Sequence, residues 1–353
     1  MRRSVALTVV IATHNRPEVL KLTLASLSAQ TFQNWTALVI GDCCDPRTGE
    51  AVSSIGDSRI RYFNLPARCG DQSSPNSIGA TLCQTPYLAL LNHDDLLVAD
   101  HFELCLERLE TSGADICLAT TAWVVRWREG RDGLVPQYQV VPRAPLLPIH
   151  AILPADARRF EPVSAWVMRT EAYRRAGDWK DPSELYRTPF NDWLLRVARA
   201  GLQTVCSWPL SVIKVETHYA QEPAGSAYRA SSVVHRRIVD DMGQRSPHAL
   251  REWIMGGTQQ QKGARRAALL VRRIARPMTN LICALLRPVL ASIFENTDRD
   301  LYDTWCRLLG RRRGWWKVAS LRGRTGEAPP PPADRLRLLA AARAALSAVD
   351  GAA

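Results

Sequence analysis

Eight consecutive residues near the start of the chain, Val-Ala-Leu-Thr-Val-Val-Ile-Ala at positions 5–12, constrain the fold more than any other feature. A run this apolar and β-branched, without polar alternation, predicts a strand buried on both faces. Further strand-like runs follow at Trp35–Ile40, Ile60–Asn64 and Tyr87–Leu91, separated by segments with helical spacing. Such alternation with short connections predicts a mostly parallel sheet flanked by helices, which is an α/β fold.

The remaining chain carries weaker signals. Residues 126–160 are rich in Arg, Pro and Gly without a stable period, and we expect loops over a cleft there. Four consecutive prolines end at Pro332 and predict a stiff linker before a short helix at 334–348. Other expected elements are helices at Ser77–Gln84, Asp100–Leu109, Glu171–Ala176, Asp192–Ala200 and 229–256, and strands at Ala114–Val125, Val163–Met168 and Gln203–Val215.

The basic charge of the chain is concentrated in one segment. The net charge is +12, and Lys262–Arg324 holds 15 Lys and Arg against 4 Asp and Glu. Arginines interleaved with leucines and isoleucines suit an anionic membrane interface, whereas a solvated or domain-packing tail is the plainer alternative. No nucleic-acid-binding module is recognisable, so we expect no nucleic-acid partner. No apolar, uncharged stretch of about 18–20 residues predicts a membrane span, and the apolar N-terminal stretch is too short for a signal peptide.

The nine cysteines show no metal-binding spacing. Their odd number and their apolar neighbours predict reduced core thiols in a cytosolic protein. The adjacent pair Cys43 and Cys44 is the one place where a disulfide between neighbours would be possible.

Polar residues follow the predicted strands where ligands bind in parallel sheets, at the carboxyl ends. These residues are His14 and Asn15, then Asp42, then Asn92–Asp95. Carboxylate and amide oxygens suit Mg²⁺ or Mn²⁺, which bridge to phosphates. The alternative is that Asp94 and Asp95 cap the next helix.

Four of these segments together resemble the motifs of family 2 glycosyltransferases. They are Val9–Arg16, Val39–Asp42, Gly70–Gly79 and Tyr87–Leu96, in the family's order and at similar spacing. A weaker match continues to about residue 217 through Pro162–Arg169, Gly177–Trp179 and Asn191–Trp193. The resemblance implies a GT-A fold and inverting transfer of a sugar from a nucleotide-diphosphate donor. The donors that we expect are UDP- or dTDP-sugars. The implied acceptor is a hydroxyl of a lipid-linked or growing cell-surface polysaccharide.

The resemblance also implies roles for individual residues. Asp94, with Asn92 in place of the usual first acid, would hold a divalent metal (Mn²⁺ or Mg²⁺) on the diphosphate. Asp42 would accept a hydrogen bond from a pyrimidine N3–H, and Asp95 would order the turn or contact the donor sugar or ribose. The further nucleotide-binding candidates are Thr13, His14, Asn15, Arg68 and Asn76.

Asp192 is the candidate general base, by its similarity to the family's Glu-Asp pair, and helix capping is its rival role. Lys214 and His218 are candidates for diphosphate contact. Trp166, like Trp123 and Trp127, could stack on a sugar, although most of the eleven tryptophans of such a chain belong to the core.

Together these features predict a catalytic domain over 1–225, with a nucleotide half to about residue 100 and an acceptor half after it. A basic helical extension would follow over 226–327, and a linker and helix over 328–353. The predicted location is the cytoplasm, at the inner face of the cell membrane. The alternatives are a non-catalytic nucleotide- or sugar-binding protein of the same fold, favoured by Asn92 and Asn191, and a sugar nucleotidyltransferase. A sugar nucleotidyltransferase would need a Gly-rich phosphate loop bearing Lys or Arg after the first strand, and Thr13–Pro17 of this chain is not one.

Overall fold

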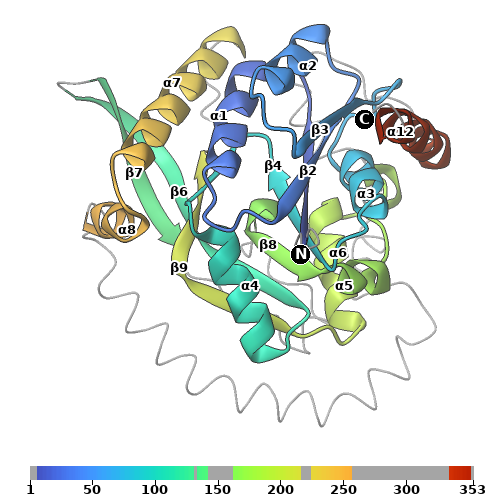
Figure 1. The fold of residues 1–353 in the computed structure, drawn as a ribbon. Coiled ribbons are helices and arrows are strands. Elements are labelled where there is room, and N and C mark those ends of the chain that lie inside the picture. The colour runs from blue at the N-terminus through green and yellow to red at the C-terminus, as the bar shows by residue number, and fades with distance from the viewer. Residues whose placement is uncertain (1–5, 131–132, 142–161, 216–223, 257–333, 351–353) are drawn as a thin grey trace.

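A computed structural model describes residues 6–130, 133–141, 162–215, 224–256 and 334–350 (Figure 1). The strands are β1 (Leu7–Thr13), β2 (Trp35–Gly41), β3 (Ile60–Asn64), β4 (Tyr87–Asn92), β5 (Asp95–Leu97), β6 (Ile116–Gly130), β7 (Gly133–Val141), β8 (Trp166–Arg169) and β9 (Thr204–Val215). The helices are α1 (Pro17–Ser28), α2 (Pro46–Ser53), α3 (Ser73–Thr81), α4 (His101–Ser112), α5 (Thr170–Ala176), α6 (Pro189–Arg199), α7 (Ala224–Gly243), α8 (Pro247–Gly256) and α12 (Arg335–Asp350), with short 3₁₀ turns at Val163–Ala165 and Pro182–Glu184.

The described strands form a single sheet in the order β3-β2-β1-β4-β8-β6-β9-β5, with β7 paired to β6. Its first four strands are parallel, as the alternation of strands and helices predicts. In this register Thr13 pairs with Gly41, and Ala12 pairs with Asn92. The carboxyl ends of β1, β2 and β4 therefore lie side by side, which brings the three predicted polar segments together.

The other part of the sheet is mixed. β8 runs antiparallel to both β4 and β6, whereas β6 and β9 are parallel. The short strand β5 pairs antiparallel with β9 and sets Asp95 opposite Lys214. A residue from the far part of the chain is thus delivered to the turn that follows β4.

The prediction of loops after residue 125 is wrong for its first part. β6 continues to Gly130 and pairs antiparallel with β7, so 116–130 and 133–141 form two long paired strands. Pro136 is tolerated because β7 is an edge strand in the described sheet, and its residue needs no N–H for a second neighbour. The remainder, 142–161, lies outside the described residues.

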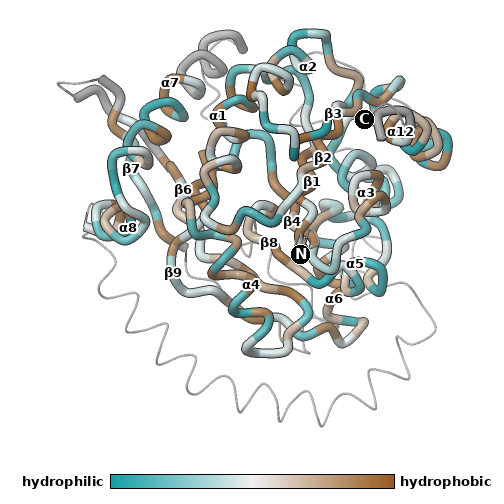
Figure 2. Tube along the Cα trace, viewed as in Figure 1, coloured by the Kyte–Doolittle hydropathy of each residue, from teal (hydrophilic) through white to brown (hydrophobic). Residues whose placement is uncertain are grey.

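Three groups of buried apolar residues hold the layers together, and Figure 2 shows the hydrophobic colouring gathered along the central strands. The largest lies between the sheet and helices α1, α4, α5 and α6. The second joins α7 and α8 to β6, β7 and β9. The third joins α12 to β2, β3 and α3 through Leu338 and Ala342, which are 4% and 0% exposed. The predicted C-terminal helix is therefore present, and it packs on β2, β3 and α3.

Two local features differ from simple sequence patterns. Asn15 precedes α1 and is of a type that often caps helices, but its backbone has a left-handed φ of 45° and its side-chain oxygen accepts the backbone N–H of Asp45. Arg16 occupies the cap position instead. α3 begins at Ser73, earlier than its sequence pattern indicates.

The described cysteines are thiols: Cys43 is exposed, and Cys44, Cys69, Cys83, Cys105, Cys117 and Cys206 are buried. Within the described ranges, none of the helices has the length and apolar character needed to cross a bilayer. The basic segment 262–324 lies outside those ranges.

Candidate functional site

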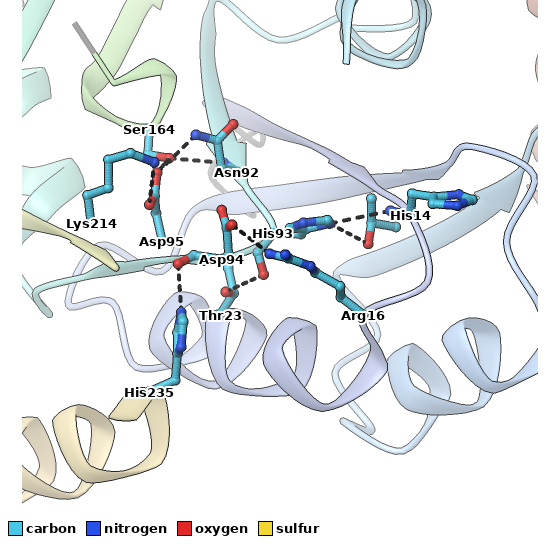
Figure 3. A network of polar contacts seen from close by, with 11 residues as sticks. His14, Arg16, Thr23, Asn92, His93, Asp94, Asp95, Ser164, Lys214 and His235 are labelled. Carbon is cyan, nitrogen blue, oxygen red and sulfur yellow. Dashed lines mark hydrogen bonds and ion pairs between the residues drawn. The ribbon is translucent and has the colours of Figure 1, made fainter. Parts of the chain in front are cut away.

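The end of β1 is tied to the turn after β4 through His93 (Figure 3). The backbone N–H of His14 donates to Nδ1 of His93 at 3.3 Å, and the Thr13 hydroxyl lies 2.9 Å from the same nitrogen. Since the backbone N–H can only donate, Nδ1 is the unprotonated nitrogen, and the Thr13 hydroxyl also donates to it. Burial lowers the pKa of His93 to about 4, so the ring is neutral at neutral pH.

The end of β2 orders the loop in front of α3. Both carboxylate oxygens of Asp42 accept backbone hydrogen bonds, one from Cys69 and the other from Gly70 at 2.8 Å. The carbonyl of Asp42 also accepts from Nδ1 of His14 at 2.8 Å, which fixes that imidazole. Asp42 is only 5% exposed, so its described role is to shape this loop. Each oxygen keeps a second lone pair, and the reading of a pyrimidine base by Asp42 stays a prediction.

Asp95 lies at the centre of a buried polar network. Its side chain is fully buried, and its Oδ2 accepts hydrogen bonds from the Ser164 hydroxyl and, at 3.0 Å, from the Asn92 amide. Nζ of Lys214 lies 3.5 Å from the other oxygen. Burial raises the pKa of Asp95, against the opposing effect of Lys214. These contacts tie Asp95 into the turn after β4, and helix capping is excluded because α4 begins at His101 with Asp100 in the cap position. Contact of Asp95 with a donor sugar or ribose stays a prediction.

Asp94 faces the opposite way, toward α1 and α7 (Figure 3). Its Oδ2 lies 3.0 Å from a guanidinium nitrogen of Arg16, and its backbone carbonyl accepts from Nε2 of the buried His235 at 2.7 Å. Burial opposes the charge of Asp94, but interactions with His93, Lys214 and Arg16 overcome it and hold the pKa of the carboxyl below its usual range. Asp94 therefore carries a negative charge that is already paired.

The residues around this turn do not make a convincing metal centre. In the described part of the chain, no group of three or more His, Cys, Asp and Glu side chains is arranged to hold a metal ion. Asp94 is bound to Arg16, Asp95 is buried and bound to Lys214, and Asn92 supplies a neutral oxygen. Mg²⁺ and Mn²⁺ prefer carboxylate oxygens, and here each carboxylate already has a cation beside it. The donor set does not fit the predicted divalent metal.

Asp192 lies one turn inside α6, not at its start. Its backbone N–H donates to the carbonyl of Thr188, which is the residue in the cap position. Helix capping is therefore not its role. Its Oδ2 accepts from Nε of Arg196 at 2.9 Å, and Arg196 also donates to the carbonyls of Ala176 and Asp178. The carboxylate is thus held on a fixed, positively charged support.

The other candidates have varied surroundings. Asn15 is exposed beside the Asp42 loop, Arg68 directly precedes Cys69 in that loop, and Asn76 is 2% exposed within α3. Trp166 is corrected to a core residue: it is fully buried and stacks on Trp193 with ring centres 5.3 Å apart, so it presents no face to a sugar. Trp123 and Trp127 are part-buried on β6. His218 lies outside the described residues.

The sequence reasoning missed Arg16, Ser164 and His235. Arg16 stands in the first motif, but its pairing with Asp94 joins positions 78 residues apart. Ser164 and His235 come from segments without regular alternation, and their contacts depend on how β8 and α7 pack. One signal could have pointed to such residues. An acid directly after a buried strand, such as Asp95, needs hydrogen-bond donors nearby if it is itself buried.

Comparisons with known proteins agree with these motifs. Residues 8–173 match the model of the family described as glycosyl transferase family 2. The "Succinoglycan biosynthesis protein ExoO" of Rhizobium meliloti is 27% identical over 111 residues, 31% of this chain and 32% of that protein. The "Uncharacterized protein y4gI" of Sinorhizobium fredii is 30% identical over 108 residues, 30% of this chain and 12% of that protein. The chain thus spans a third or less of these curated relatives.

Among solved structures, S. aureus TarS 1-349 in complex with UDP-GlcNAc is similar, with a TM-score of 0.49 and 12% identity, over 71% of this chain and 72% of that chain. The same protein in complex with UDP gives a TM-score of 0.48, over 65% of each chain. The described architecture, a sheet with a parallel N-terminal half and helices on its faces, is the α/β GT-A class expected from the sequence. Residues 8–173, the part of the chain that holds the four motifs, are thus similar to glycosyl transferase family 2.

Proposed function

We propose that this protein transfers a sugar from a UDP- or dTDP-sugar to a hydroxyl of a lipid-linked or growing cell-surface polysaccharide, with inversion. The observation that carries the proposal is the convergence of three strand ends. Thr13 and His14, Asp42, and Asn92–Asp95 come from β1, β2 and β4 and are joined by hydrogen bonds through His93 and His14. Nucleotide sugars bind at such strand ends in open α/β sheets.

The proposed chemistry divides between the two halves of the sheet. The β1, β2 and β4 ends would hold the nucleotide, with the diphosphate at the Asn92–Asp95 turn. The acceptor hydroxyl would attack the anomeric carbon while the bond from that carbon to the diphosphate oxygen breaks, and one such displacement inverts the configuration. Asp192 would take the hydroxyl proton, as a general base must. Its connection to the turn runs through Trp193, which stacks on Trp166, two residues after Ser164.

A nucleotide panel tests the proposal. UDP and dTDP should raise the melting temperature of the protein more than ADP or GDP, because Asp42 would accept the N3–H that only a uracil or thymine ring presents in that place. Replacing Asp42 by Ala should weaken UDP binding by about 1–3 kcal/mol, through loss of a charged acceptor and of the Cys69–Gly70 loop. Equal shifts with all four nucleotides would remove the support for a pyrimidine donor.

A non-catalytic binding protein is the second candidate, and the amides at Asn92 and Asn191 favour it. The two candidates differ in turnover. Incubation with UDP- or dTDP-sugars and a crude membrane acceptor, followed by analysis of the anomeric linkage, should give a product of inverted configuration. Tight UDP binding without transfer or hydrolysis of any donor would favour the second candidate.

We also infer that the protein works at the inner face of a cell membrane. The support is the excess of basic residues in 262–324, interleaved with apolar residues. Basic residues at an anionic surface contribute about 1 kcal/mol each. Sedimentation with anionic vesicles, reversed by high salt, tests this location.

A further inference from the structure

We propose that Arg16 and Lys214 supply the positive charge that holds the donor diphosphate, so that this protein binds its donor without a divalent cation. The proposal rests on the proposed function, because it concerns the same donor site. It follows from the disagreement between the metal that the family resemblance implies and the side chains that surround the Asn92–Asp95 turn.

The first step is the charge balance at the turn. Two carboxylates, Asp94 and Asp95, face two cations, Arg16 and Lys214, at 3.0 and 3.5 Å. His93 adds no charge, because its Nδ1 accepts the backbone N–H of His14 and is therefore unprotonated. Asn92 removes the negative charge that an acid would contribute there. The turn is therefore close to neutral before a ligand arrives, and a divalent cation has no unpaired anionic charge to bind.

The second step is exposure. The side chains of Arg16 and Asp94 are 28% and 17% exposed, whereas Lys214 is 14% and Asp95 0% exposed. The guanidinium of Arg16 is thus the more exposed of the two cations, and the acid of the Lys214 pair is wholly buried. A diphosphate approaching the turn would meet the guanidinium first, and the ammonium of Lys214 would add its charge from the other side of the turn.

The third step is the chemistry of the guanidinium. Arg16 has five N–H donors in a planar fork, and one terminal nitrogen is placed on Asp94. Such a group can keep a carboxylate on one edge and bind phosphate oxygens on another. Asp94 then acts as a positioning residue, because it holds the fork at the strand ends. Any divalent cation at Asp94 would be repelled by the guanidinium bound to the same oxygen.

The experiment is calorimetric titration of the full chain with UDP, in EDTA and again with Mn²⁺. We expect the dissociation constant of the wild-type protein to change by less than about threefold between the two, because the cations are built in. Arg16→Gln should weaken UDP binding by about 10- to 100-fold, since charge-assisted hydrogen bonds to phosphate are lost. Its affinity for uridine, which has no phosphate, should stay unchanged. Arg174→Gln is the matched control, because that arginine also pairs with an acid but lies on α5.

Asn92→Asp provides the reverse test. It places a carboxylate beside Asp95, where the Asn92 amide now donates, and so adds a negative charge that neither cation of the turn pairs with. Mn²⁺ should then strengthen UDP binding by about tenfold or more. Arg16→Lys keeps the charge without the fork and should give an intermediate loss, which separates a lost contact from a misfolded variant. A wild-type protein that needs Mn²⁺ to bind UDP, or an Arg16→Gln variant that behaves like Arg174→Gln, would overturn the inference alone. Failure of UDP, dTDP and their sugars to bind under either condition would instead reject the proposed function, and this inference with it.

Discussion

Asp192 is the residue for which we propose the role of general base. Its carboxylate is 11% exposed and is held by Arg196, whose other nitrogens are fixed on two backbone carbonyls. Asp192→Asn keeps the shape but cannot accept a proton. Transfer should fall by roughly 10²–10⁴ while donor affinity stays near normal. Two quantities are measured for each variant: the turnover rate, and the affinity for UDP by calorimetry. Asp240→Asn, on the exposed face of α7, is the control. Full turnover in Asp192→Asn would place the base elsewhere.

His101 gives the stability of the protein a pH dependence. It is 1% exposed and lies 2.9 Å from the Ser211 hydroxyl, and burial lowers its pKa from 6.5 to about 3. Below pH 6.5 the unfolded chain binds a proton at His101, whereas the folded chain binds it only at about pH 3. The free energy of unfolding therefore falls as the pH drops through this window. From about pH 7.5 to about pH 5, this histidine alone should cost about 2 kcal/mol.

His101→Gln tests that contribution by urea unfolding at both pH values. The variant should lose about 2 kcal/mol less than the wild-type protein on acidification. Burial raises the pKa of Asp71 to about 6, which shifts the stability in the opposite direction, but this carboxyl is present in both proteins and cancels in the comparison. Identical pH profiles would show that His101 binds its proton as readily in the folded protein as in the unfolded chain.

At the scale of elements, α3 lies against β1 at a glycine. A Cβ added to Gly79 would lie 2.4 Å from Cγ1 of Val10, in the middle of the buried strand. Glycine inside a helix normally costs about 1 kcal/mol relative to alanine, so an open position would gain from the exchange. Here the close approach of Val10 outweighs that gain in helix stability, so the exchange lowers the free energy of unfolding. Gly79→Ala should destabilise the protein by about 1–3 kcal/mol in urea unfolding.

The double variant Val10→Ala with Gly79→Ala serves as the internal check, because the smaller strand residue makes room for the methyl group. Its loss should be smaller than the sum of the two single losses. Gly243→Ala on α7, where nothing lies within 4 Å of the added carbon, should not destabilise. Additive losses in the double variant would mean that α3 and β1 do not meet at this point.

The elements differ in how well the sequence predicts them. β1, β2 and β4 follow from their apolar runs, because strands buried on both faces need little tertiary information. β3 is only part-buried and follows from its position in the alternation of strands and helices. The β6–β7 pair could not be predicted in the same way, since its Gly, Pro and Arg content is typical of loops and its pairing is set by β8 and β9.

The same division holds for the site. The motifs place Thr13, Asp42 and Asp94 at strand ends, and the structure brings them together. Their partners do not follow from spacing: Arg16 crosses from α1 to the turn, and His235 arrives on α7. Pairing across such distances is a property of packing, which a single sequence does not record.

At the scale of the whole molecule, α12 covers an apolar surface formed by β2, β3 and α3. Leu338 is 4% exposed among residues of β2, β3 and α3, and Arg61 of β3 donates to the carbonyl of Leu346. Leu338→Ala should destabilise the protein by about 2–4 kcal/mol, through lost burial and the cavity left behind. Leu336→Ala on the same helix, at 80% exposure, should change stability by no more than about 0.5 kcal/mol. Thermal or urea unfolding measures both, and equal effects would show that α12 is not docked.

The docking of α12 also sets an order of events during synthesis. The apolar surface that it covers, with Leu38, Ile40 and Leu65, is made early in the chain, and Arg335 follows Thr81 by roughly 250 residues. At translation rates of about 5–20 residues per second, that surface waits roughly 10–50 seconds for its cover. During that interval the nascent chain already contains its central strands. The apolar surface of β2, β3 and α3 is then uncovered, and it is exposed to the chaperones around the ribosome.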